Sequence, residues 1–250
     1  MRPGWRVLVT GLGLFFGIPA YAAPYPTAEQ LRNAIAETTA QLKSERLEVE
    51  SLDAQADGVT RPLMASGFSL GDGVCVVYYN AKPEDGLVQF FDSVPAADLS
   101  IWLNSVAVHE ITHCIEKREA YVHRRFDKVL PAGYSRDNMT IQGYSSVVRS
   151  GAVEIWGEAL ADIASVLYFQ QAVPERWEQF ANGLAAMRRN LAGKWPEHDT
   201  SVWLRKVVAA RPQNPANQSL FETAFQLRRQ FSTASDVPAI PAPRAEAGEH

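Results

Sequence analysis

The chain has 250 residues, of which 46% are hydrophobic and 21% charged, and its formal net charge is −4. This length and hydrophobic content are sufficient for one domain with a sizeable core. The mild negative charge favours neither nucleic acid nor an anionic membrane surface as a partner, so we expect neither.

Residues 1–22 have the pattern of a secretory signal peptide. Two arginines precede an apolar run over residues 7–18, and Ala20 and Ala22 supply the small residues typical of a cleavage site after Ala22. The run is too short to span a bilayer comfortably, and no later stretch is long enough. We therefore expect export to the periplasm or out of the cell, with no integral membrane segment after cleavage.

An N-terminal helix is predicted within residues 23–52. Thr27 and Gln30 form a capping-box pattern, which favours a helix start at this point. Apolar side chains then recur on one face, which extends the predicted helix to about Glu50.

Residues 53–95 contain Gly and Pro between two or three short predicted strands. The strongest strand pattern is Cys75–Tyr79, where β-branched and aromatic residues follow one another. A weaker strand pattern covers Leu87–Phe91.

A helix from about Pro95 to about Arg118 contains His109-Glu110-Ile111-Thr112-His113, which reads HExxH. Positions i and i+4 share one face of a helix, so His109 and His113 can bind one ion. Glu110 is then placed to accept a proton from a water molecule that the ion activates. The motif predicts a metal site with Glu110 as general base.

A catalytic zinc site needs a third protein ligand and one open position. Glu154, Glu158 and Asp162 lie four residues apart in a second predicted helix, over about 150–172. Three acids on one stripe of an apolar helix are costly unless a positive group faces them. This stripe therefore supplies the best candidates for the third ligand.

The pairing of HExxH with the later E-x-x-A-D of residues 158–162 resembles the gluzincin branch of the zinc metallopeptidases, which includes thermolysin and the CAAX-processing membrane proteases. The resemblance implies that His109, His113 and Glu158 bind zinc and that Asp162 hydrogen-bonds a ligand imidazole. It also implies that a downstream His or Tyr stabilises the oxyanion. His198 is the best candidate for this role, and Tyr134 and Tyr144 are others.

Other third ligands remain open. Glu154, one helical turn before Glu158, is the main alternative. Glu119 stands where the metzincin pattern has its last His, although Glu116 replaces the Gly of that pattern and is expected to be solvated. Cys75 resembles the upstream Cys ligand of deformylases in its position, but the sequence around it lacks the motifs of that family.

Cys75 and Cys114 are the two cysteines of the chain. An even pair in an exported protein suggests a disulfide. A Cys75–Cys114 bond would hold the strand Cys75–Tyr79 beside the HExxH helix.

Further helices are predicted over Glu175–Leu191 and from about Ser201. The Pro- and Ala-rich composition of residues 236–250 predicts a disordered tail. The predicted fold class is α+β and predominantly α-helical, a single zincin-like domain over 23–235 with a small sheet packed beside the HExxH helix.

The predicted function is an exported, zinc-dependent metallopeptidase that acts on a peptide or protein and binds one zinc ion per chain. Two alternatives stay open. One is a non-proteolytic zinc amide hydrolase acting on a cell-wall or small-molecule substrate, and the other is a catalytically inactive interaction protein with a zincin fold.

Overall fold

The structure is a computed structural model that describes residues 25–56, 63–83, 85–134, 138–213 and 219–232. The predicted signal peptide and the predicted tail lie outside the described residues.

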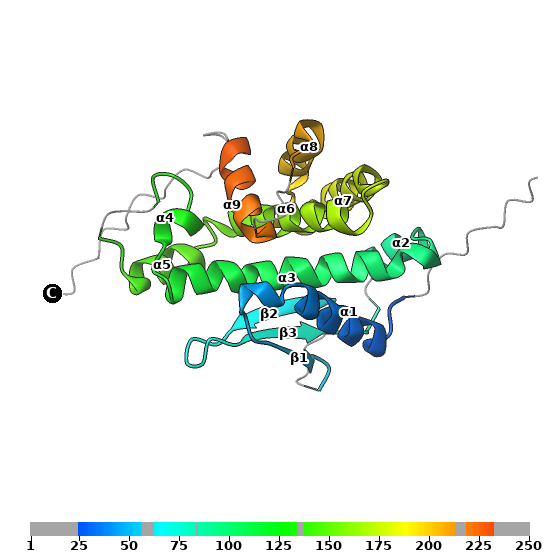
Figure 1. The fold of residues 1–250 in the computed structure, drawn as a ribbon, viewed down its shortest axis with the longest axis horizontal. Helices are drawn as coiled ribbons and strands as arrows, with labels where there is room; N and C mark the ends of the chain where they lie inside the picture. Colours follow the sequence, from blue (N-terminus) through cyan, green and yellow to red (C-terminus); the bar gives the residue numbers. More distant parts are fainter. Residues whose placement is uncertain (1–24, 57–62, 84, 135–137, 214–218, 233–250) are drawn as a thin grey trace, which may run out of the picture.

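Helix α3 (Leu99–Tyr121) runs through the middle of the fold, between two layers (Figure 1). A three-stranded sheet and α1 lie on one side of α3, and α6 to α9 lie on the other side. The predicted α+β, mainly helical fold is therefore confirmed. The remaining elements are α1 (Ala28–Gln41), β1 (Val49–Asp53), β2 (Met64–Phe68), β3 (Cys75–Tyr79), α2 (Asp85–Asp92), α4 (Phe126–Val129), α5 (Ile141–Arg149), α6 (Glu154–Ala172), α7 (Trp177–Leu191), α8 (Ser201–Ala210) and α9 (Leu220–Phe231).

The helices α3 and α6 pack against each other in opposite directions. The Ser165 hydroxyl donates to the Ser105 carbonyl at 3.0 Å, which joins the C-terminal half of α6 to the N-terminal half of α3. Further along, Gly157 lies against Glu116, and a Cβ at residue 157 would be only 3.2 Å from the Glu116 carboxylate. The small side chains of α6 thus allow a close approach, which brings its acidic stripe to the HExxH residues.

The sheet has the order β1-β3-β2, so β3 lies in the centre. β1 pairs with β3 in parallel and β2 pairs with β3 antiparallel. A disulfide joins Cys75 at the start of β3 to Cys114 of α3, with the Cα atoms 5.6 Å apart. The predicted disulfide and the predicted position of the sheet beside the HExxH helix are both confirmed.

The prediction of one long N-terminal helix is wrong in its second half. The capping box of Thr27 and Gln30 is present, but α1 ends at Gln41. A 3-10 turn follows, and Arg46 adopts a left-handed backbone with φ 52°, which turns the chain into β1. The prediction extended the apolar pattern of α1 too far, because Val49, Ser51 and Asp53 of β1 are not strong helix formers and pair with β3 as a strand.

The predicted strand over Leu87–Phe91 is also wrong, because these residues belong to α2. Leu87, Phe90 and Phe91 recur at helical spacing and pack against the core. The predicted start of the HExxH helix at Pro95 is corrected to Leu99, after a 3-10 turn over Ala96–Asp98.

No helix within the described ranges combines the length and the apolar character needed to cross a membrane.

Candidate metal centre

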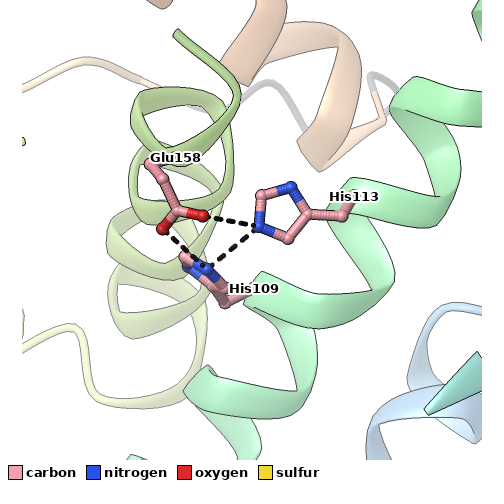
Figure 2. A group of neighbouring side chains, drawn as sticks. All are labelled: His109, His113 and Glu158. Carbon is pink, nitrogen blue, oxygen red and sulfur yellow. Dashed lines mark hydrogen bonds and ion pairs between the residues drawn. The ribbon is translucent and has the colours of Figure 1, made fainter. Parts of the chain in front are cut away.

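His109 and His113 project from α3 toward Glu158 of α6 (Figure 2). The Nε2 atoms of the two histidines are 3.2 Å apart. Glu158 Oε2 lies 3.3 Å from His109 Nε2, and Glu158 Oε1 lies 3.3 Å from His113 Nε2. The three side chains that the sequence predicts as ligands therefore converge on one point.

These spacings fit a tetrahedral zinc ion. Ligand atoms bound at about 2.0–2.1 Å from tetrahedral zinc lie roughly 3.3 Å from one another. The two Nε2 atoms are 3.2 Å apart, which agrees with that value, and each of them lies 3.3 Å from one of the two Glu158 oxygens. Two imidazoles and one carboxylate can therefore bind one zinc ion and leave its fourth position for water or substrate.

Asp162 contacts the His109 ring nitrogen that faces away from the ligand group, as predicted. Its Oδ1 lies 2.8 Å from His109 Nδ1, so that the imidazole N–H points to the carboxylate and Nε2 faces the ligand point. Asp162 is itself held by Arg188, whose Nε and NH2 donate to the two carboxylate oxygens at 2.7 Å each, and by the Thr200 hydroxyl. This network fixes the orientation of a ligand histidine.

Arg188, like Thr200, belongs to this cluster and was missed by the sequence analysis. Its NH2 also lies 3.4 Å from Glu158 Oε2, so one guanidinium contacts two of the three acids of the α6 stripe. It sits in α7 between Leu184 and Leu191, on the face that packs inward. The sequence feature that could have identified it is an Arg inside the apolar stripe of an amphipathic helix.

The charges of this cluster shift one another's pKa values. Burial lowers the pKa of His109, but the charge of Glu158 and the hydrogen bond to Asp162 outweigh it and raise this pKa to about 10. Burial raises the pKa of Asp162, but Arg188 and His109 bring it down to about 2. The cluster therefore stabilises positive charge between its imidazoles and carboxylates, which a proton or a metal ion can supply.

Glu110 differs from the other acids of the cluster. Its carboxylate is largely buried and lines the same cavity as the ligand group. Its charge helps to raise the pKa of Arg188, but it makes no hydrogen bond or ion pair with any described residue, whereas Glu158 and Asp162 make several. This unengaged carboxylate, one residue past a ligand histidine, is suited to accept a proton.

A cavity of about 600 Å³ opens onto the candidate ligands, a size typical of small-molecule and peptide sites. Side chains of α2, α3 and α7 and residues of β2 form most of its wall. The residues lining it beside the metal group include Leu63, Met64, Ser66, Leu87, Phe90, Phe91, Val106, Glu110, Lys117, Leu184, Met187, Leu191, Trp195, Glu197 and His198.

His198 lies beside the candidate ligand group. Its Nδ1 lies 3.1 Å from Glu158 Oε2, and burial of its side chain is incomplete, with 32% exposed. Glu154, the alternative ligand, lies instead beside Glu197 and His198 and not in the His109, His113 and Glu158 group. The geometry thus selects Glu158 over Glu154 as the partner of the two histidines.

The other rival residues are committed elsewhere. Glu119 pairs with Arg125 at 2.9 Å and Lys128 at 3.2 Å, and Cys75 is in the disulfide. Glu116 is not solvated as expected but pairs with the buried Arg228 at 2.7 Å.

Tyr134 and Tyr144 are buried outside the lining of the cavity. The Tyr144 ring packs against Tyr121 and Phe126. Neither tyrosine can therefore serve as the oxyanion donor in this arrangement, which corrects that part of the prediction.

Comparisons of the chain with models of protein families, with curated proteins and with solved structures found no match.

Proposed function

We propose that this protein is an exported zinc metallopeptidase of the zincin type. The observation that carries the proposal is the convergence of His109, His113 and Glu158 at mutual distances of 3.2–3.3 Å, next to the unengaged carboxylate of Glu110. A vestigial site in an interaction protein would not need to retain both features.

Zinc, when bound by His109, His113 and Glu158, would lower the pKa of a water molecule and polarise the scissile carbonyl. Glu110 accepts the proton of the attacking water and delivers it to the leaving amine. Asp162, held by Arg188 and Thr200, keeps His109 in the tautomer that presents Nε2. His198 remains the proposed donor to the developing oxyanion, from its place on the cavity wall.

Two features favour a peptide as the substrate. In the described part of the chain, β2 pairs with β3 only, so it is an edge strand. Its first residues line the cavity together with the HExxH helix. An edge strand offers backbone donors and acceptors to an extended peptide, which can add to the sheet.

Export is supported by the pattern of residues 1–22 and by the Cys75–Cys114 disulfide, a bond that persists mainly in oxidising compartments.

The test is to compare the wild type with Glu110→Gln on a mixed peptide library. Because Gln cannot accept the proton, we expect the variant to keep its zinc but to lose turnover by about two to four orders of magnitude. Glu29→Gln, a change of an exposed acid in the first turn of α1, serves as the control. Near-normal hydrolysis by Glu110→Gln, or no hydrolysis of any peptide by the zinc-loaded wild type, would contradict the proposal.

A further inference from the structure

Six residues of α3 line the cavity, and four of them form one row: Val106, Glu110, His113 and Lys117. Their spacings of four, three and four residues keep them on one face of the helix. With a rise of 1.5 Å per residue, Val106 and Lys117 lie roughly 16 Å apart along the axis. The cavity therefore follows α3, with the candidate ligands between its two ends.

The end near Val106 is apolar. Leu87, Phe90 and Phe91 of α2 and Leu184 and Leu191 of α7 line the cavity, and both helices contact Trp102 of α3, one turn before Val106. Contacts between the elements fix this position, since Phe90 packs edge-on against Trp102 of α3 with ring centroids 4.9 Å apart. This end is suited to a bulky apolar group.

The end near Lys117 carries a positive charge. Lys117 Nζ makes a long hydrogen bond of 3.4 Å to the Ser66 carbonyl of β2. No Asp or Glu among the described residues lies within ion-pair distance of Nζ, whereas Arg188, the other long cationic side chain on the wall, is bound to Asp162 and Glu158. The Lys117 ammonium is thus available to a ligand.

We propose that the cavity selects substrates with a carboxylate on one side of the scissile amide and a bulky apolar group on the other, and that Lys117 binds the carboxylate. This inference rests on the proposed peptidase function and names its substrate class. Lys117 follows the ligand His113 by four residues, about 6 Å along the helix, which is roughly two residues of an extended peptide. The carboxylate should therefore lie within about two residues of the cleaved bond.

Such a carboxylate has two sources, the C-terminus of a peptide or an acidic side chain. The test uses peptides with Leu on one side of the cleaved bond and either Glu or Gln on the other side, within two residues of that bond. Both orders of these residues along the peptide are tested. Each peptide is made with a free and with an amidated C-terminus, and mass spectrometry identifies the cleaved bond.

For the wild type, in one of the two orders, we expect kcat/KM to be about tenfold higher for the peptide of each pair that carries the carboxylate. A tenfold effect is what one partly exposed hydrogen bond between charged groups provides. Dependence on Glu over Gln assigns a side-chain carboxylate, and dependence on the free over the amidated end assigns a C-terminal one.

Lys117→Met should reduce this ratio to near one while zinc content stays at the wild-type value, and Lys117→Glu should invert it. Lys43→Met, a change of an exposed lysine on the short turn after α1, is the matched control and should keep the wild-type ratio.

At the apolar end, Val106→Trp should lower kcat/KM for peptides with Leu more than for the same peptides with Ala. The exposed Val148 gives the control, Val148→Trp, which should not alter this ratio.

Hydrolysis that depends on Glu110 but shows no carboxylate preference, or a preference that persists in Lys117→Met, would overturn the substrate assignment and leave the peptidase function in place. Failure to cleave any peptide would instead contradict the proposed function, and the substrate assignment with it.

Discussion

Asp162 is the most heavily engaged acid near the candidate metal centre. It accepts hydrogen bonds from His109, Arg188 and Thr200 and is almost fully buried, with 1% exposure. It does not itself complete the ligand group, so its contribution is to orient His109 and raise the basicity of that ligand.

Replacing Asp162 by Asn should therefore weaken zinc binding by about 10–100-fold, as is typical for the loss of a partner behind a ligand. Competition with a zinc chelator measures the affinity, and the exposed Asp127→Asn is the control. Unchanged zinc affinity in Asp162→Asn would show that the His109–Asp162 contact does not tune the site.

The ligand residues could be predicted because the spacing of HExxH and of the acidic stripe is a property of single helices. Arg188 and Thr200 could not be placed in the same way, since they come from separate elements and meet Asp162 only when α7 and α8 pack on α6. The resemblance also suggested tyrosine donors, but Tyr144 is used in an aromatic contact on another side of α3.

At the scale of elements, the disulfide holds the sheet against α3. Cys75 and Cys114 are 39 residues apart, and the bond joins the central strand to the helix that carries both histidines. Closing a loop of this length limits the freedom of the unfolded chain, which stabilises the folded state.

Replacing both cysteines by Ala should lower the free energy of unfolding by about 2–4 kcal/mol. Urea denaturation of the variant, compared with the oxidised and the reduced wild type, gives the measurement. The reduced wild type should resemble the variant, and equal stability of all three forms would contradict a stabilising role for the bond.

Ion pairs of Glu119 also join α3 to α4. Glu119 is buried, which raises its pKa, but the charges of Lys128 and Arg125 outweigh burial and lower this pKa below its ordinary value of 4.5. Because the folded state favours the ionised form, the stabilisation is present above about pH 4.5 and is lost as the pH falls through the lower, folded-state pKa.

Glu119→Gln should therefore destabilise the protein by about 1–2 kcal/mol at pH 7 and by much less at acidic pH. Unfolding by urea at both pH values measures the difference, with the exposed Glu48→Gln as control. A deficit that is the same at both pH values would assign the effect to packing instead of charge.

The elements that the sequence predicts correctly are those with strong internal patterns, such as the capping box of α1, the β-branched run of β3 and the apolar stripe of α7. The predicted N-terminal helix ran into β1 because the apolar pattern of α1 was extended too far, whereas pairing with β3 makes β1 a strand. The five residues Leu87–Phe91 of α2 fit the apolar spacing of a strand as well as that of a helix. Contacts with α3 and α7 favour the helix.

At the scale of the whole molecule, the two layers around α3 have complementary tasks. The α6–α8 layer supplies Glu158, Asp162, Arg188 and Thr200, whereas the sheet supplies the edge strand that borders the cavity. The site is therefore formed only when both layers pack on α3, which is why neither the cavity nor its two unlike ends could be predicted from local patterns.

The central claim is that His109, His113 and Glu158 bind one zinc ion. The most direct test is elemental analysis of protein purified without chelator and then dialysed in the presence of equimolar zinc. We expect about one zinc per chain in the wild type and in Glu154→Gln, and a much lower content in Glu158→Gln. A wild type that binds no zinc, or a Glu158→Gln variant with full zinc content, would contradict the claim.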